Sequence, residues 1–107
     1  MRALARGRAE PDAVIDLHGL TQAEAHGRLI GFLRRARSAG HGLVLVVTGQ
    51  GGRDGGTGER GVLRRVVPHW LQVADLRSLV LGFEEAGTRQ GGAGALYVRL
   101  RRDRSHG

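Results

Sequence analysis

Apolar residues along this chain alternate between short β-branched runs and longer stripes with helical spacing. The segment Val14-Ile15-Asp16-Leu17-His18-Gly19 is short and β-branched at its start, and it predicts a strand ending at Gly19. Residues 43–47 are apolar without interruption, which is typical of a central strand covered by helices on at least one face. Two more strands are expected at residues 79–83 and 96–100.

A helix is predicted between the first two strands. Thr21 can cap it and Glu24, three residues later, can complete a capping box. Gly40 suits the left-handed residue that follows a helix. Between these signals, apolar residues recur at helical spacing and predict one buried stripe, made of Ala25, Leu29, Leu33 and Ala36 and joined by Phe32.

A second helix is predicted over residues 62–71, after a glycine-rich loop. Its expected buried side consists of Leu63, Val66, Val67, Trp70 and Leu71. Pro68 lies inside this segment, and we expect it to kink or split the helix because proline removes one backbone hydrogen bond.

The order of elements, βαβαββ, predicts an α/β two-layer sandwich in which two helices cover a four-stranded mixed sheet. A strand, a helix and a strand in succession imply parallel pairing of the first two strands. In the last strand, residues 96, 98 and 100 are apolar and alternate with Tyr97, Arg99 and Arg101, so one buried and one polar face are expected. We assign residues 1–13 to a flexible basic arm, 14–102 to the domain and 103–107 to a tail.

Composition excludes several classes of protein. The 107 residues are enough for one domain with one core, and they contain no cysteine, which excludes disulfides, thiol catalysis and a cysteine zinc site. No apolar run approaches the roughly 20 residues of a membrane span, and the N-terminus lacks the apolar stretch of a signal peptide. We therefore expect a soluble, cytoplasmic protein with no membrane partner, acting as a monomer.

The charge of the chain indicates a polyanionic partner. The formal net charge is +7, and all 17 basic residues are arginine. A GC-rich genome would explain arginine in place of lysine, but it does not explain the excess of positive over negative charge. Arginine holds phosphate through two parallel hydrogen bonds and stacks on bases, so nucleic acid is the expected partner.

Asp16 and His18 are the first candidates for chemistry. Residues two apart on a strand point to the same side, and these two stand at the carboxyl end of a predicted parallel strand, where open α/β sheets bind ligands. An imidazole can transfer protons near neutral pH, and a neighbouring carboxylate can orient it or hold a metal. The alternative is structural, with the aspartate capping a turn and the histidine filling a strand end. The spacing alone favours this alternative.

Two glycine-rich segments could approach a phosphate through the backbone. Thr48, Gly49, Gln50 and Gly51 follow the second strand, and a plain flexible turn is the alternative reading. Residues 56–61 match G-x-G-x-x-G, but they stand too far from the strand to be a dinucleotide fingerprint. The second glycine-rich segment contains Gly92 and Gly94 and enters the last strand.

Arg99, Arg101 and Arg102 follow in and after that strand. They predict a cationic edge that contacts nucleic acid. A solvated, charged edge that blocks aggregation is equally consistent with this segment taken alone.

Together these segments resemble, in order, the motifs of the Smr (small MutS-related) family, including its bacterial stand-alone members. The resemblance covers residues 13–102 and rests on Ile15-Asp16-Leu17-His18-Gly19, Thr48-Gly49-Gln50-Gly51 and Gly92-Ala93-Gly94-Ala95-Leu96-Tyr97-Val98. Gln50 stands where many family members carry lysine, which removes a cation that could have held a phosphate.

The resemblance implies a fold similar to the C-terminal domain of translation initiation factor 3. It also implies endonuclease activity, either DNA nicking, with branched DNA as one candidate substrate, or cleavage of structured RNA. Asp16 and His18 are then the catalytic candidates, beside the loop of Thr48, Gly49 and Gly51. No cofactor is required by the sequence, and Asp16 is the candidate ligand should Mg²⁺ or Mn²⁺ take part.

Two other functions compete with the endonuclease. The same arginines could serve a non-catalytic DNA- or RNA-binding module in which Asp16 and His18 are structural. A small-molecule phosphate or nucleotide binder ranks third because it rests on the glycines alone.

Overall fold

The first helix begins and ends where its capping residues predict. The computed structural model describes residues 10–49, 59–86 and 94–102, and in it α1 spans Gln22–Ser38. The Thr21 hydroxyl accepts from the amide of Glu24 at 3.2 Å, and the Glu24 carboxylate accepts from the amide of Thr21 at 3.0 Å, which completes the capping box. At the other end Gly40 has φ +85°, as the predicted left-handed residue.

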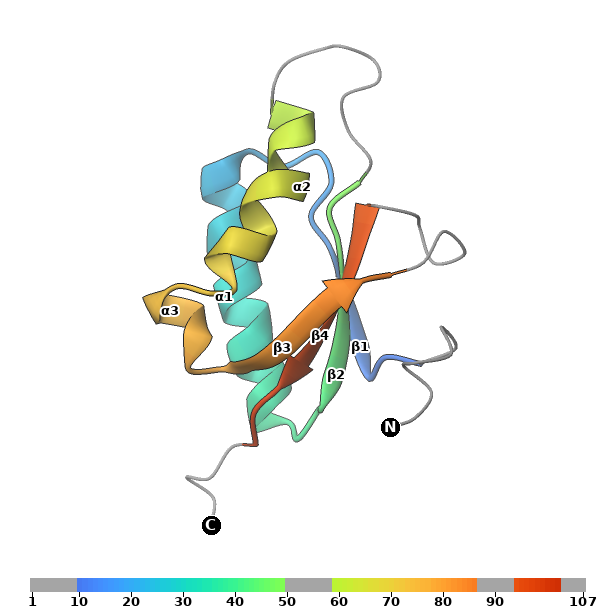
Figure 1. The fold of residues 1–107 in the computed structure, drawn as a ribbon, viewed down its shortest axis with the longest axis vertical. Helices are drawn as coiled ribbons and strands as arrows, with labels where there is room; N and C mark the ends of the chain where they lie inside the picture. Colours follow the sequence, from blue (N-terminus) through green and yellow to red (C-terminus); the bar gives the residue numbers. More distant parts are fainter. Residues whose placement is uncertain (1–9, 50–58, 87–93, 103–107) are drawn as a thin grey trace.

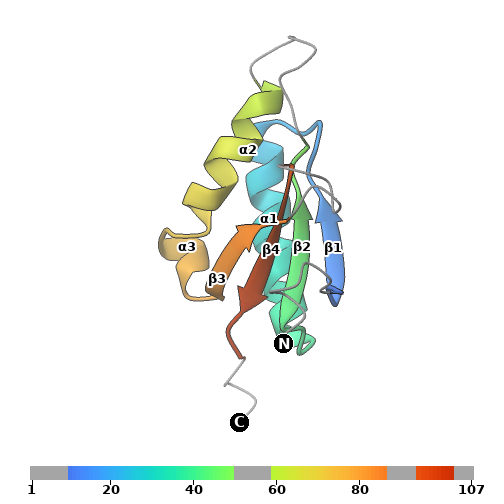
Figure 2. The same cartoon turned by 45° about the vertical axis from the view of Figure 1, so that its right-hand side comes forward.

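The strands form one mixed four-stranded sheet in the order β1-β2-β4-β3 (Figure 1). Their bounds are Ala13–Asp16 for β1, Leu43–Val47 for β2, Val80–Glu85 for β3 and Ala95–Leu100 for β4. The first two strands pair in parallel, which confirms the predicted βαβ unit. Strand β4 runs antiparallel to both of its neighbours, so its carboxyl end lies at the opposite edge of the sheet from those of β1 and β2 (Figure 2).

The second helix differs from its prediction at both ends. It spans Glu59–Trp70 as one helix, α2, and is not split at Pro68. Because Pro68 stands in the last turn, the helix continues only two residues beyond it. A four-residue helix, α3 (Ala74–Arg77), follows and was not predicted, since one turn is too short to show helical periodicity. It packs the fully buried Leu76 into the core.

Helices α1 and α2 lie against one face of the sheet, which gives the predicted two layers (Figure 1). The stripe of α1 is buried at Ala25, Leu29, Leu33 and Ala36, and it meets α2 and the inward side chains of the sheet. The fifth predicted member, Phe32, is partly buried and packs against the same core. Each fully buried leucine or valine contributes roughly 1.5–3 kcal/mol relative to exposure. The largest of these side chains include Leu29, Leu33, Leu63, Val44, Val67 and Val98.

The predicted polar face of the last strand is wrong for part of β4. Ala95 and Tyr97 are buried and form a second, smaller cluster with Leu43 and Ala86. The physical reason is sheet order: β4 lies between β2 and β3, so neighbouring strands flank it on both sides. Only Arg99, which is half-buried, keeps a polar side chain on that face within the strand.

The sheet begins slightly before the predicted boundary of the domain. The amide of Asp12 donates to the carbonyl of Leu43 at 2.7 Å, and β1 itself starts at Ala13. Residues 1–9 of the expected arm and the tail, residues 103–107, lie outside the described part of the chain. In the part that is described, no helix is long and apolar enough to cross a membrane.

Candidate active site

Leu17 anchors the two candidate catalytic residues. Strand β1 ends at Asp16, three residues before the predicted end, but the amide of Leu17 still donates to the carbonyl of Val47 at 2.7 Å. The Leu17 side chain is fully buried in the core. Because successive side chains of an extended segment alternate, Asp16 and His18 both point away from the core.

A tight turn follows directly and places His18 at a corner of the chain. The amide of Leu20 donates to the carbonyl of Leu17 at 3.1 Å, and Gly19 at the third position has φ +84°. A positive φ at this position is the requirement of a type II turn, which glycine meets without strain. The glycine after His18 is therefore explained by the backbone.

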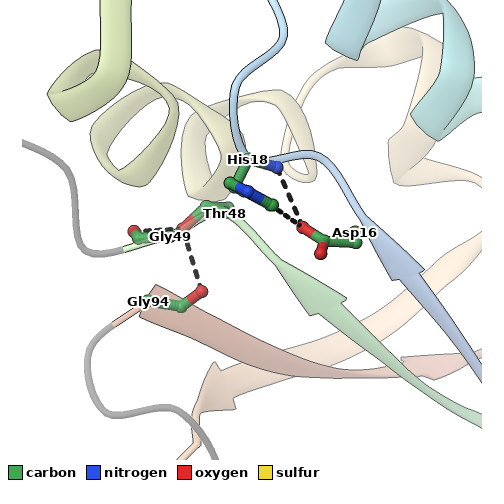
Figure 3. Close-up of polar contacts among 5 residues, drawn as sticks. All are labelled: Asp16, His18, Thr48, Gly49 and Gly94. Carbon is green, nitrogen blue, oxygen red and sulfur yellow. Dashed lines mark hydrogen bonds and ion pairs between the residues drawn. The ribbon is translucent and has the colours of Figure 1, made fainter.

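Asp16 and His18 form a close pair at the surface (Figure 3). Nδ1 of His18 lies 2.7 Å from Oδ1 of Asp16, and the amide of His18 donates to the same oxygen at 3.0 Å. The side chain of His18 is 67% exposed and that of Asp16 is 53% exposed. A large substrate can therefore reach both groups without any opening of the fold.

The pair fixes which nitrogen of the imidazole can accept a proton. Partial burial raises the pKa of Asp16, but the hydrogen bonds from the ring and amide of His18 outweigh it and hold that pKa below its usual value. Asp16 is thus ionised at neutral pH and can only accept hydrogen bonds, so Nδ1 of His18 carries the proton. The lone pair of the neutral ring then lies on Nε2, the atom available as a base.

Gly49 lies just after the end of β2 and packs directly against His18. Its φ is +85°, and a Cβ atom built on Gly49 would lie 3.0 Å from Cβ of His18. In Figure 3 the imidazole lies between Asp16 and the segment of Thr48 and Gly49. Gly49 therefore has two reasons to be glycine, its backbone conformation and its contact with His18.

The carbonyl of Gly94 holds this segment in place. It accepts from the amide of Thr48 at 2.7 Å, the amide of Gly49 at 3.0 Å and the hydroxyl of Thr48 at 3.2 Å. The Thr48 side chain is buried. A phosphate contact through these donors would have to compete with the Gly94 carbonyl, so the geometry gives Thr48 and Gly94 a positioning role behind His18.

Replacing Thr48 by valine tests this positioning role. The variant keeps the shape of the side chain but removes its hydrogen bond to Gly94, and we expect it to lower the free energy of unfolding by about 1 kcal/mol. Thr48→Ser retains the hydroxyl and is the matched control. Urea denaturation of the two variants measures the difference, and equal stabilities would show that the hydroxyl does not hold this loop.

The predicted arginines of the site do not lie beside His18. Gln50, Gly51 and Gly92 lie outside the described residues. Arg99, Arg101 and Arg102 lie toward the opposite edge of the sheet, because β4 is antiparallel to β2 and pairs Arg99 with Leu43, at the start of β2. At roughly 3.3 Å per residue, the six steps along the chain from Gly42 to Thr48 separate the two edges by about 20 Å.

Around Asp16, the part of the chain that the structure describes supplies one carboxylate as a candidate metal ligand. Within the described ranges, no three histidine, cysteine, aspartate or glutamate residues cluster as metal ligands. Asp16 contributes a single carboxylate, one oxygen of which already accepts two hydrogen bonds from His18.

The sequence matches known proteins over most of its length. Its relatives include the ribosome rescue factor SmrB of Shewanella putrefaciens, 31% identical over 94% of this chain and 51% of that protein. The ribosome rescue factor SmrB of Yersinia enterocolitica is 33% identical over 92% of this chain and 49% of its own length. The chain thus spans about half the length of these relatives.

Solved structures share the fold. The stand-alone small MutS-related protein YdaL from Escherichia coli matches with a TM-score of 0.74 and 28% identity, over 91% of this chain and 71% of that one. The Smr domain of Thermus thermophilus MutS2 matches with a TM-score of 0.68 and 31% identity, over 83% of this chain and 98% of that one. The family model of the Smr domain covers residues 15–101, and the chain therefore belongs to the Smr family.

Proposed function

We propose that this Smr domain binds nucleic acid and cleaves phosphodiester bonds at Asp16 and His18. The observation that carries the proposal is the exposed carboxylate–imidazole pair with 2.7 Å between Oδ1 and Nδ1. A carboxylate that orients an imidazole is the usual arrangement of a general base. The net charge of +7 supports a polyanionic substrate.

In the proposed reaction, Nε2 of His18 removes a proton from the attacking oxygen, which belongs to water or to a ribose 2′-hydroxyl. That oxygen forms a bond to phosphorus while the bond from phosphorus to the leaving oxygen breaks. The leaving oxygen takes a proton from the imidazolium, which returns His18 to its neutral form. If the leaving oxygen takes its proton from solvent, the imidazolium releases its own proton to solvent. Asp16 stabilises the imidazolium while it exists and keeps its orientation.

RNA is the favoured polymer because relatives that align over 92–94% of this chain are named ribosome rescue factors. Those proteins are about twice the length of the aligned segment, so their ribosomal role is extended here only as part of the proposal. DNA is the other candidate substrate. The discriminating assay offers supercoiled plasmid and structured RNA to the protein, with and without EDTA.

We expect cleavage of at least one of the two substrates. Comparison of the reactions with and without EDTA shows whether a divalent ion takes part. The second candidate function is a non-catalytic nucleic-acid-binding module, favoured by the excess of arginine alone. Binding without cleavage of either substrate, with every divalent ion tested, would establish that module and contradict the nuclease.

Binding is expected to weaken steeply as salt increases. If the domain neutralises roughly 3–5 phosphates, a plot of log K against log salt concentration has a slope of about −3 to −5. Fluorescence anisotropy of a labelled duplex or hairpin between low and physiological salt measures the slope. A slope near zero would remove nucleic acid as the partner.

A further inference from the structure

A cavity of about 480 Å³ opens at the edge of the sheet opposite Asp16 and His18. Its walls come from three places in the chain. Arg37 comes from the last turn of α1, His41 from the turn before β2, and Arg101 and Arg102 from the segment after β4. None of these elements belongs to the site around His18.

Arg37 is the inner cation of the cavity. Its Nη2 donates to the carbonyl of Arg102 at 3.4 Å, a long contact that links α1 to the end of β4. Its Nε is buried and has no hydrogen-bond partner among the described residues. A buried donor without an acceptor is costly, and the guanidinium that carries it lines a cavity whose other permanently charged residues are Arg101 and Arg102.

The carbonyl and carboxylate oxygens near the cavity already accept hydrogen bonds from backbone amides. The last carbonyls of α1 accept from the backbone: Ala36 from the amide of His41 at 3.0 Å and Arg37 from the amide of Gly40 at 3.0 Å. The carboxylate of Asp12 accepts from the amides of Gly42 and Leu43 at 2.9 and 3.1 Å. Neither Asp12 nor any other acidic residue is among the described residues that line the cavity, so guanidinium groups set the charge of its wall. Two of them, on Arg101 and Arg102, belong to exposed residues.

We propose that this cavity binds a backbone phosphate of the nucleic-acid strand that reaches Asp16 and His18 further along its length. The inference rests on the proposed function for the identity of the polymer. Guanidinium groups suit phosphate because their N–H donors match its oxygens in pairs. The separation of about 20 Å between the two edges corresponds to about six stacked nucleotides at about 3.4 Å each.

The test compares a cavity variant with a control of equal charge. Arg101→Gln with Arg102→Gln removes two cations from the cavity, whereas Arg28→Gln with Arg34→Gln removes two exposed cations of α1 that do not line it. Binding of single strands of four and twelve nucleotides is measured by anisotropy. All variants carry His18→Ala so that no strand is cleaved.

We expect the affinity gained on lengthening the strand to shrink by about 10-fold in the cavity variant, with the salt slope reduced by 1–2. The control should change that gain by less than about twofold. Equal losses in the two variants would overturn the proposal, because they would show a general charge effect. Unchanged affinity in the cavity variant would overturn it as well.

A measurement with inorganic phosphate shows whether the cavity binds a free anion or a phosphate of a nucleic-acid strand. If phosphate raises the melting temperature of the His18→Ala protein but not of the cavity variant in the same background, while strand affinity is the same in both, the cavity takes the free ion and the proposal is wrong. Arg37→Lys keeps the charge but removes the paired N–H donors of the guanidinium, and it should lower strand affinity while circular dichroism stays unchanged. All binding is measured without cleavage. Strand binding by the cavity is therefore tested separately from the nuclease assignment.

Discussion

Replacing His18 by alanine is expected to lower cleavage by about 10²–10⁴-fold while nucleic-acid affinity stays nearly unchanged, the effect typical of losing a general base. The reason is that Nε2 of His18 is the base that the geometry offers, since Asp16 fixes the proton of the ring on Nδ1. Single-turnover cleavage, with affinity measured separately, gives the two quantities.

His69→Ala is the matched control for this prediction. His69 is an exposed histidine in the last turn of α2, and it plays no part in the site. It should leave cleavage unchanged. Full activity in His18→Ala would remove the catalytic assignment altogether, whereas a parallel loss of affinity would mean that His18 binds the substrate.

The second large effect is expected at Gly49. In Gly49→Ala the new Cβ atom meets Cβ of His18 at 3.0 Å, and the neighbouring backbone must shift to relieve the contact. We expect cleavage to fall by about 10²-fold, since a displacement of about 1 Å in a catalytic group has this consequence. The positive φ adds a stability loss of roughly 1–2 kcal/mol.

Gly40→Ala separates these two effects. Gly40 has the same φ, +85°, but a Cβ atom there has nothing within 4 Å. Its variant should lose similar stability and keep its rate of cleavage. Melting temperatures and cleavage rates of the two variants provide the comparison, and equal rates would show that the contact of Gly49 with His18 does not matter for the reaction.

Local signals in the sequence predicted the elements whose causes are local. The capping box of Thr21 and Glu24, the left-handed Gly40 and the buried stripe of α1 depend on residues within a few positions of one another, and all are confirmed. The pairing of Asp16 with His18 is of the same kind, because it follows from the two-residue period of an extended chain.

Contacts between distant parts of the chain could not be predicted from these local signals. The carbonyl of Gly94 supports Thr48 from 46 residues away, and Arg37 meets Arg102 from 65 residues away. The sequence also did not reveal that the antiparallel direction of β4 places Arg101 and Arg102 far from His18. That direction depends on sheet order, which no single strand encodes.

The burial of Tyr97 was missed for the same reason. Alternation with Arg99 and Arg101 predicted a polar face, but β4 is a central strand and Tyr97 packs with Leu43. The period of a strand shows which residues share a face. Whether that face is covered depends on the strands beside it.

A double-mutant cycle of Asp16→Asn and His18→Ala tests most directly whether the two residues act as one catalytic unit. Asp16 works through His18 in this account, so the double variant should cleave no more slowly than His18→Ala alone, within about twofold. The cycle is measured as single-turnover rates on the substrate that the unmodified protein cleaves best. If the two losses multiply in the double variant, Asp16 and His18 act independently, and the pair is not the catalytic unit.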